Sequence, residues 1–294
     1  MVTSMERAAP EISVIVPFYN NEQFIERCVQ SLLAQTYSPT SYEILMVDNN
    51  SNDGSAQIVR NYPQVRLLRE GKQGAYAARN HGVALSRGAI LVFTDADCVP
   101  SPDWLKEIVA PFSDPKVGLV QGRRIFGDDA STLSMLAAYE AEIHALIFSG
   151  EDKGALFGYT NNMAVRREVF ERCGPFLETA RGADSIFVDR VVRTFSHQVL
   201  RYARAATIRH LELNSVRHWL GKKAIYGRSF QRHRKERLTH TDLTPADRTA
   251  IFRRTTERAG YSAAQAAWLF AVISTGRVSF LYGRLTSRRM ATDK

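Results

Sequence analysis

Short apolar runs alternate along the first hundred residues with segments whose apolar positions recur at helical spacing. The apolar runs predict strands over 12–16, 43–47, 65–68 and 89–93. The helical spacing predicts helices over 24–33, 55–62 and 74–84. Strands separated by helices of this length form βαβ units. We therefore expect an α/β fold with a mostly parallel sheet flanked by helices on both faces.

The pattern is less regular beyond Val120. It predicts a helix over 133–148, a strand over 162–165, a helix over 185–195 and, from residue 214 onward, helices only. Pro17 is expected to end the first strand, and Thr239 and Gly260 are expected to lie near breaks in the last region. We therefore divide the chain into a sheet-containing domain over 1–213 and a basic helical C-terminal region over 214–294.

The two parts differ in charge. The 294-residue chain has a net charge of +9, but residues 1–200 hold 19 Lys and Arg against 24 Asp and Glu, whereas residues 201–294 hold 20 against 6. A basic appendage of this kind typically meets an anionic partner, such as a membrane surface, a nucleic acid or a phosphorylated substrate. The alternative is a solvated helical face that binds nothing in particular.

The segment 217–237 combines aromatic with basic side chains. These are Trp219, Tyr226 and Phe230 with Arg217, Lys222, Lys223, Arg228, Arg232, Arg234, Lys235 and Arg237. The segment fits an amphipathic helix on an anionic membrane or a clamp for a substrate phosphate. The uncharged stretch 261–276 has 16 residues, fewer than the roughly 20 of a spanning helix, so we expect no transmembrane segment. Its burial in a helical subdomain, a homodimer or the membrane interface stays open.

Two features bear on the compartment. Residues 1–10 carry charge and no apolar run, so we do not expect a secretory signal. Cys28, Cys98 and Cys173 lie far apart without metal-binding or redox spacing, which fits free thiols in a reducing compartment. We therefore expect a cytoplasmic protein, with peripheral attachment at the cytoplasmic face of the membrane as an open alternative.

Polar clusters follow two of the predicted strands. Asp48 and Asn49 come after the second strand, and Asp95-Ala96-Asp97 comes after the fourth. Ligands of parallel sheets bind at the carboxyl ends of the strands. Two carboxylates one residue apart repel each other unless a cation is present, and hard divalent cations prefer such oxygen ligands. The sequence therefore favours a metal site after the fourth strand over the alternative of a solvated loop.

Four longer segments occur in a set order. They are ISVIVPFYNNEQFIERCVQSLLAQTY, EILMVDNNSNDGS, GAYAARNHGVALSRGAILVFTDADC and TNNMAVRREVFERCGPF. Together they resemble the inverting nucleotide-sugar glycosyltransferases of family 2, which have the GT-A fold, over most of residues 12–210. The resemblance implies that residues 1–213 bind a nucleotide sugar and transfer the sugar to an acceptor hydroxyl with inversion.

The resemblance also implies roles for residues at the ends of the first two strands. Pro17, Tyr19 and Asn21 would line the base and ribose pocket, and Asp48 and Asn49 would hold the base or ribose. Asn49 replaces the second acid that the family often has at this turn. Because an amide both donates and accepts hydrogen bonds, this change would alter the base preference.

A second group would lie around the diphosphate. Arg79 would lie near the donor diphosphate or sugar, the alternative being a helix-surface ion pair, and Asp95 would contact the ribose or donor sugar. Asp97 would ligate a divalent metal, Mn²⁺ or Mg²⁺, which would neutralise charge on the leaving nucleoside diphosphate. His210 stands where many members of the family have a histidine that completes the metal site. Its alternative is a histidine in a basic surface loop.

The segment Gly182-Ala183-Asp184 resembles the Glu-Asp pair of the family, in which the aspartate is the catalytic base. Alanine stands at the glutamate position here, so the resemblance leaves Asp184 alone as the base. Asp189 is expected to pair with Arg190 or Arg193, not to take part in catalysis. Trp104 and Phe126 are expected in the core more than in stacking on a sugar.

Other classes of protein fit less well. A sugar nucleotidyltransferase would have a Gly-rich basic loop after the first strand, where this chain has Pro17-Phe18-Tyr19-Asn20, and a NAD-binding Rossmann enzyme would have a G-x-G-x-x-G motif there. The remaining rival is a non-catalytic membrane- or nucleic-acid-binding protein on a decayed glycosyltransferase scaffold.

We therefore expect a metal-dependent inverting glycosyltransferase of cell-surface glycan, glycolipid or secondary-metabolite biosynthesis. Its acceptor is unknown, with a lipid-linked acceptor as one alternative. A homodimer stays open, and no nucleic acid is expected as partner.

Overall fold

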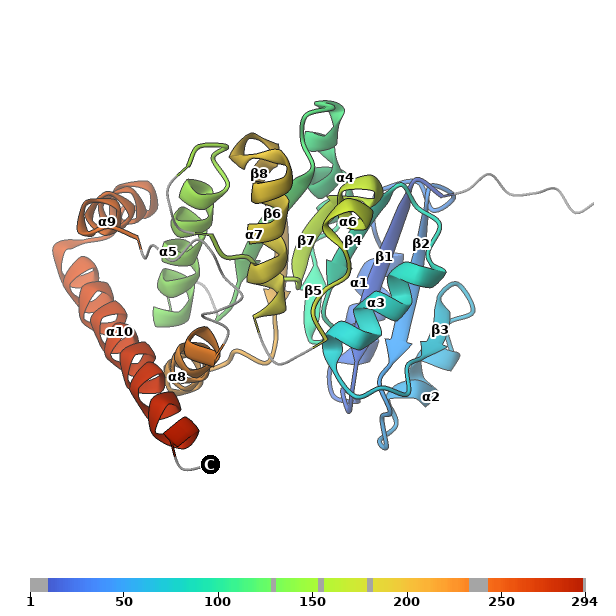
Figure 1. Cartoon of the computed structure of the whole chain (residues 1–294), viewed down its shortest axis with the longest axis horizontal. Coiled ribbons are helices and arrows are strands. Elements are labelled where there is room, and N and C mark those ends of the chain that lie inside the picture. Colours follow the sequence, from blue (N-terminus) through green and yellow to red (C-terminus); the bar gives the residue numbers. More distant parts are fainter. Residues whose placement is uncertain (1–9, 128–130, 153–155, 179–181, 233–242, 293–294) are drawn as a thin grey trace, which may run out of the picture.

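The computed structural model describes residues 10–127, 131–152, 156–178, 182–232 and 243–292, with the side chains of 230–232 and 287–292 left undescribed. An eight-stranded sheet runs through the molecule with helices on both faces (Figure 1). This arrangement confirms the expected α/β fold.

The sheet has the strand order β3-β2-β1-β4-β7-β6-β8-β5. Its strands are β1 (Ile12–Phe18), β2 (Tyr42–Asp48), β3 (Arg66–Arg69), β4 (Ile90–Thr94), β5 (Cys98–Pro100), β6 (Leu119–Ile125), β7 (Asn162–Arg166) and β8 (Leu200–His210). Four of the seven pairings are parallel. They are the pairings of β1 with β2, of β1 with β4, of β2 with β3 and of β6 with β8. β7 runs antiparallel between these two parallel groups.

Helices pack on both faces of the sheet. They are α1 (Ile25–Leu33), α2 (Ser55–Arg60) and α4 (Trp104–Val109) on one face, and α3 (Ala75–Leu85), α6 (Arg167–Cys173) and α7 (Ala183–Phe195) on the other. Alternate residues of each strand feed the two cores, so Val14 and Val16 pack under α1 while Ile15 packs under α3. Both faces are buried, which is why the first strands are mostly apolar.

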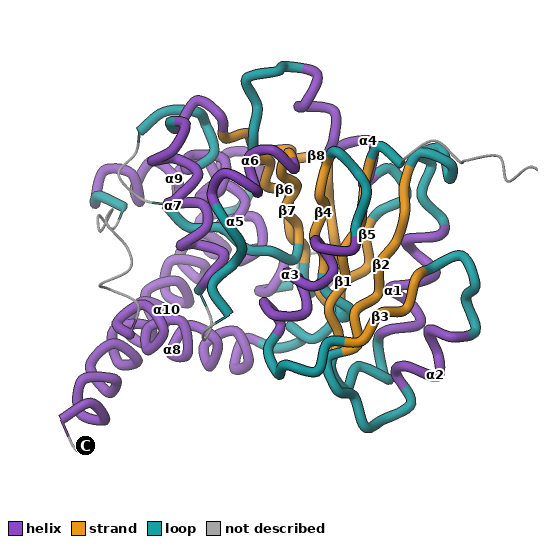
Figure 2. Tube along the Cα trace, turned by 45° about the vertical axis from the view of Figure 1, so that its right-hand side comes forward, coloured by secondary structure: helices purple, strands orange, loops and turns teal. Residues whose placement is uncertain are grey.

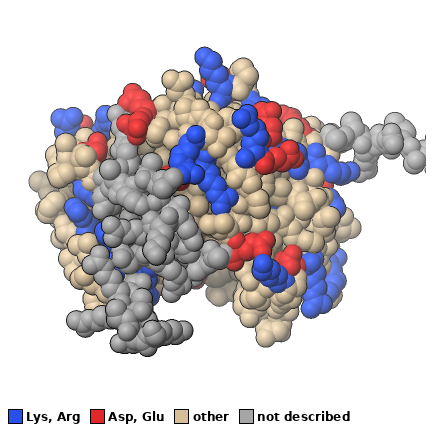
Figure 3. Space-filling model, viewed as in Figure 1, with Lys and Arg blue, Asp and Glu red and all other residues tan. Residues whose placement is uncertain are grey.

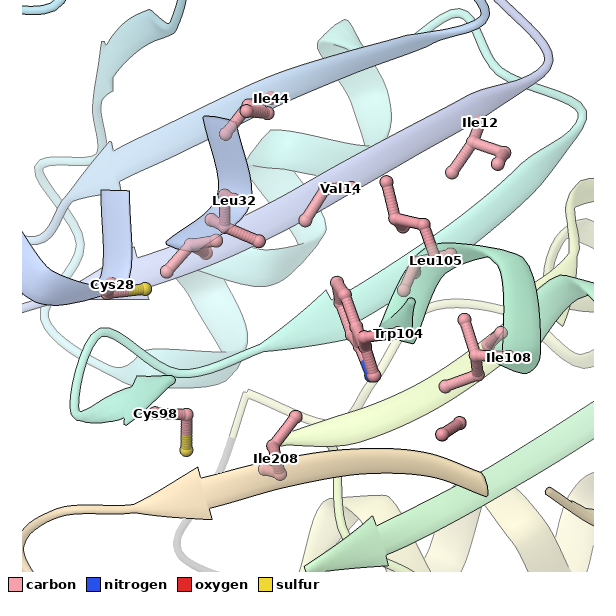
Figure 4. Packing of buried hydrophobic residues seen from close by; sticks show 14 of the residues in the cluster. Ile12, Val14, Cys28, Leu32, Ile44, Cys98, Trp104, Leu105, Ile108 and Ile208 are labelled. Carbon is pink, nitrogen blue, oxygen red and sulfur yellow. The ribbon is translucent and has the colours of Figure 1, made fainter. Parts of the chain in front are cut away.

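Two predicted side-chain positions lie in the core. Trp104 is fully buried and Phe126 is 1% exposed, so neither faces a sugar-binding surface. Figure 4 shows Trp104 pointing from α4 into the cluster that contains Val14 and Ile208. Its ring Nε1 donates to Asn162 Oδ1 at 2.8 Å, which ties α4 to β7.

The prediction for Pro17 was wrong, because β1 continues to Phe18. β1 pairs with β4 only over Ile12 to Ile15, so Pro17 lies where that side of the strand has no ladder partner. The sequence also missed β5, β6 and β8, although β7 lies where a strand was predicted.

The described residues after 214 form helices and their connections, as predicted. They are α8 (Val216–Arg232), α9 (Pro245–Ala259) and α10 (Ala263–Thr292), and all three gather around α5 (Thr132–Ile147) (Figure 2). Gly260 ends α9 in the left-handed conformation with φ 64°, which confirms that break. The break expected near Thr239 lies outside the described residues, as do Arg234, Lys235 and Arg237. The division of the chain at residue 213 stays a prediction.

The helix α10 is longer than the uncharged stretch, because it continues past Gly276 through Arg277 and Arg284. Residues Ala263–Thr286 are long and apolar enough to cross a membrane by length and composition, and 17% of the most apolar window is buried. The argument that this segment is too short was therefore wrong. A single helix of this kind is weak evidence for a membrane span by itself.

Candidate active site

The pairing of β5 with β8 brings Asp97 and His210 together. Cys98 pairs with His210 across the two antiparallel strands, and Asp97 O accepts the backbone N–H of Leu211 at 2.8 Å. As a result Asp97 Oδ2 lies 3.6 Å from His210 Nε2. Within the described part of the chain, Asp97, Cys98 and His210 form a group whose potential ligand atoms all lie within 4.8 Å of one another.

The electrostatics of this group suit a divalent cation. Burial raises the pKa of Asp97 to about 7, and the charges of Asp95 and Glu212 add to the rise. Burial lowers the pKa of His210 to about 4, with Lys222 contributing, so its imidazole is neutral at pH 7. Burial also raises the pKa of the Cys98 thiol, which stays protonated. The available ligands are thus a crowded carboxylate and a neutral imidazole, a set that fits Mn²⁺ or Mg²⁺ better than a thiolate-seeking metal.

Arg79 and Asp95 form an ion pair beside this group. Arg79 comes from α3, is 4% exposed and donates through Nη2 to Asp95 Oδ1. Its Nε is buried without a hydrogen-bond partner among the described residues, and its guanidinium lies 5.2 Å from the ring centre of Tyr76. Because the Arg79 side chain is buried, this is not an ion pair on the helix surface. It places a fixed positive charge next to Asp95, which lies two residues before Asp97 in the sequence.

Tyr76 connects this ion pair to Asp184. The Tyr76 hydroxyl accepts the backbone N–H of Asp184 at 3.4 Å, in the first turn of α7. Gly182 precedes that turn with φ 109°, a conformation that side chains rarely adopt. The Asp184 carboxylate accepts the backbone N–H of Ser185 at 2.8 Å and is partly exposed. The sequence analysis did not single out Tyr76, since an aromatic residue on a helix gives no local signal of such a contact.

Asp189 lies one turn further along α7. It is 2% exposed and forms an ion pair with Arg193 at 3.5 Å, which is one of the two predicted pairings. This ion pair lies within α7, the same helix that carries Asp184.

The other predicted residues gather at the carboxyl ends of β1 and β2. Asp48 Oδ1 accepts the backbone N–H of Ser51 at 2.9 Å. Both the nitrogen and the oxygen of the Asn49 amide bind the loop before α3. Nδ2 donates to Glu70 O and Lys72 O, and Oδ1 accepts from Gly74 N at 2.7 Å. Asn49 therefore fixes the start of the helix that carries Tyr76 and Arg79.

The loop after β1 faces the turn after β2. Asn21 N donates to Ser55 Oγ at 2.7 Å, and Asn20 Oδ1 accepts from Asn52 N at 2.9 Å. Pro17 lies opposite Val47 in the parallel register. The side chain of Tyr19 is exposed, and Asn21 Oδ1 is buried without a protein partner in the described chain. Pro17, Tyr19, Asn21, Asp48 and Asn49 thus lie together at the carboxyl ends of β1 and β2.

The basic helix α8 covers the His210 side of the site. Lys222 Nζ lies 2.7 Å from Glu212 Oε2, and Lys223 Nζ lies 2.9 Å from Glu140 Oε1. Both lysines and His210 line a small pocket of about 20 Å³, which is room for roughly one water molecule. Lys222 and Lys223 therefore reach the pocket beside His210, although both are already paired with acids.

The sequence model of glycosyl transferase family 2 matches residues 13–174. The glycosyltransferase AglE of Haloferax volcanii is 34% identical over 211 residues, which are 67% of this chain and 67% of AglE. The beta-monoglucosyldiacylglycerol synthase of Trichormus variabilis is 29% identical over 185 residues, which are 59% of this chain and 39% of that enzyme. The chain thus spans two thirds of the first relative and well under half of the second.

Solved structures show the same fold. The mannosyltransferase PcManGT from Pyrobaculum calidifontis, in complex with GDP-Man and Mn²⁺, has a TM-score of 0.64 at 20% identity, over 95% of this chain and 87% of its own. Glucosyl-3-phosphoglycerate synthase from Mycobacterium tuberculosis has a TM-score of 0.53 at 17% identity, over 77% and 81%. The fold is therefore GT-A, and the sequence relatives favour a glycosyltransferase over a nucleotidyltransferase or a NAD-dependent enzyme. This chain is a glycosyltransferase that belongs to glycosyl transferase family 2.

Proposed function

We propose that this glycosyltransferase is metal-dependent and inverting, and that it takes its sugar from a nucleoside-diphosphate sugar. One observation carries the proposal. The pairing of β5 with β8 holds Asp97 and His210 3.6 Å apart, next to the ion pair of the buried Arg79 with the partly exposed Asp95. This is a compact group of opposite charges at the carboxyl end of β4, where ligands of α/β sheets bind.

Asp97 and His210 would hold the metal. A bound divalent cation would neutralise the charge that develops on the departing nucleoside diphosphate. The His210 ring presents Nε2 towards Asp97, while its Nδ1 is buried with no hydrogen-bond partner in the described residues. The manganese ion and GDP-Man in the PcManGT complex support this role, since the two chains share a fold.

Asp184 would act as the general base. It accepts the proton of the acceptor hydroxyl while that oxygen attacks the anomeric carbon and the bond to the diphosphate breaks, so a single displacement inverts the configuration. The Ser185 N–H on its carboxylate and the Tyr76 hydroxyl on its backbone hold Asp184 in place. Arg79 holds Asp95 for contact with the ribose or donor sugar. Positioning of these groups would supply most of the rate enhancement.

The donor pocket would be formed by Pro17, Tyr19, Asn21 and Asp48, with Asn49 behind them. The unpartnered Asn21 Oδ1 and the exposed ring of Tyr19 are free to contact the nucleoside. Because the amide of Asn49 is used on the loop before α3, we assign it to positioning that loop and not to the base itself.

The three cysteines are free thiols, which fits the reducing cytoplasm. The lipid-glycosylating relative supports a lipid-linked acceptor and a role in glycolipid or cell-surface glycan synthesis.

The test is release of nucleoside diphosphate from UDP-, GDP-, CDP- and dTDP-sugars with Mn²⁺ or Mg²⁺. We expect slow hydrolysis of one donor, abolished by EDTA and by Asp97→Ala. Asp103→Asn is the matched control, because Asp103 is exposed at the start of α4 and lies outside the site. Asp184→Asn should keep the affinity for the donor and lose turnover.

Calorimetry separates binding from turnover. Wild type should bind one nucleoside diphosphate in the presence of Mn²⁺, and Asp97→Ala should bind it far more weakly. If no nucleoside diphosphate binds with metal present, the proposal fails, and a non-catalytic protein on a decayed scaffold takes its place.

A further inference from the structure

One face of α10 is apolar and exposed. Five large apolar side chains on it are between 47% and 66% exposed, namely Phe270, Val278, Leu281, Tyr282 and Leu285. Their spacing places them on one side of the helix, since each residue turns by 100°. Soluble proteins rarely leave such a continuous apolar stripe uncovered.

The opposite face of α10 is fixed to the protein. Leu269 and Val272 are buried against α5 and Trp219. Gly276 packs on the Trp219 ring, and a Cβ atom at Gly283 would overlap the carbonyl oxygen of Ala224 in α8. Glycine therefore permits a close approach of the two helices. α10 lies along the edge of the molecule (Figure 1), with one face packed on the protein and the other exposed.

Positive charge borders the apolar stripe. Arg277 and Arg284 lie one heptad apart on the flank of α10. Phe252 of α9 contacts Phe270 with ring centres 5.8 Å apart. This contact brings α9, which carries the exposed Arg253 and Arg254, to the Phe270 end of the stripe. Figure 3 shows Lys and Arg side chains along the left edge of the molecule, where α9 and α10 lie. Apolar side chains bordered by arginines are complementary to the surface of an anionic bilayer.

We propose that the exposed face of α10 is a docking surface for an anionic lipid bilayer, into which it inserts while the helix lies parallel to the membrane. The packing argues against a conventional spanning helix, because the Gly276 and Gly283 side is covered by α8, which carries Lys222 and Lys223. Arg277, midway along the helix, and Arg284, two turns further on, would lie at the level of the headgroups. The surface goes beyond the proposed transfer reaction and does not depend on it.

Trp268 provides a direct probe. The chain has three tryptophans, of which Trp104 and Trp219 are buried, whereas Trp268 is 55% exposed on α10. Full-length protein is mixed with vesicles of phosphatidylcholine alone or with added phosphatidylglycerol. We expect binding to the anionic vesicles, a blue shift of the fluorescence and protection from iodide quenching, all weakened by salt.

Two pairs of variants locate the surface. Leu281→Gln with Leu285→Gln should lower the partition coefficient about tenfold for each leucine that inserts, whereas Leu85→Gln, an exposed leucine on α3, should leave it unchanged. Arg277→Gln should lower binding to anionic vesicles about fivefold without affecting neutral ones, and Arg60→Gln on α2 should have no effect.

Three results would overturn the proposal. The first is a wild-type protein that does not bind anionic vesicles, or binds them equally well after both leucines are replaced. The second is a dimer in solution, seen by light scattering, that protects Trp268 without lipid, since the occupant would then be a second copy of the chain. The third is resistance of the bound protein to extraction by high salt and alkali, which would indicate a spanning helix.

Discussion

Glu140 is the point at which the C-terminal helices join the catalytic sheet. Its carboxylate lies 2.7 Å from Arg124 Nη2 of β6 and 2.9 Å from Lys223 Nζ of α8, and it accepts the Trp219 Nε1–H at 3.2 Å. The side chains of Glu140 and Arg124 are 12% and 16% exposed. The substitution Glu140→Gln keeps the shape of the side chain and removes the charge that both cations require.

The expected loss of stability follows from this burial. Removing one partner of a buried ion pair costs about 3–5 kcal/mol. The Lys223 side chain is 26% exposed, so it regains part of its hydration, and the glutamine oxygen still accepts a hydrogen bond. We therefore expect the lower end, about 3 kcal/mol, which in a chain of this size lowers the Tm by about 6 °C.

Denaturant and thermal unfolding at pH 7, followed by circular dichroism, measure this loss. Glu257→Gln is the matched control, since Glu257 pairs with Arg253 at 3.8 Å with both side chains about two-thirds exposed. The control should lose less than about 0.5 kcal/mol. A Glu140→Gln protein that is no less stable than this control would refute the assignment of Glu140 as the joint.

The pH dependence gives an independent check. Burial alone would raise the pKa of Glu140, but Lys223 and Arg124 more than offset it and hold the pKa well below its usual range. A depressed pKa contributes stability above the unfolded-state pKa of about 4.3, and this stability is lost as the pH falls towards the folded-state value. The difference between wild type and Glu140→Gln should be full at pH 7 and shrink by about 1.4 kcal/mol for each pH unit below about 4.3. A difference that does not change with pH would contradict the ion-pair explanation.

Three further substitutions test the site and the helix packing. Asn49→Asp, which restores an acid, should destabilise the protein by about 2 kcal/mol and weaken nucleotide binding in calorimetry, because a carboxylate would face two carbonyl oxygens of the 70–74 loop. Tyr76→Phe should lower turnover about fivefold with an unchanged donor affinity, since the backbone of the proposed base loses one hydrogen bond; a change in affinity alone would argue against this role. Gly283→Ala should lower the Tm by several degrees through its overlap with α8, whereas Gly221→Ala, with open space around it, should leave the Tm unchanged or raise it.

The N-terminal half of the fold was accessible from sequence because its signals are local. Strands β1, β2 and β4 are buried on both faces and are mostly apolar, and β1 and β2 are each followed directly by a helix. β6 and β8 could not be found in this way. β6 carries Gln121, Arg123 and Arg124, and β8 carries several arginines at half-buried positions, so neither shows a clear period of two.

The site was predictable only as far as it follows from strand ends. Asp48 is the last residue of β2 and Asp97 lies three residues after the end of β4, so their placement needs no long-range information. The meeting of Asp97 with His210 depends on the register of β5 with β8, two strands that the pattern did not reveal, so only the resemblance pointed to it. The contacts of Asn49 and Tyr76 depend on how two loops pack, which side-chain spacing does not encode.

The helix α8 contacts the candidate active site on one side and α10 on the other. The transfer reaction and the membrane surface can therefore be tested separately. Lys222 of α8 lines the pocket beside His210, whereas Gly227 lies against α10 on the far side of the same helix. Leu281 and Leu285 point away from α8, so replacing both with glutamine should leave hydrolysis of a soluble donor unchanged while vesicle binding is lost. Loss of donor hydrolysis in this variant without lipid, with an unchanged Tm, would mean that the exposed face of α10 serves the active site itself and not a bilayer.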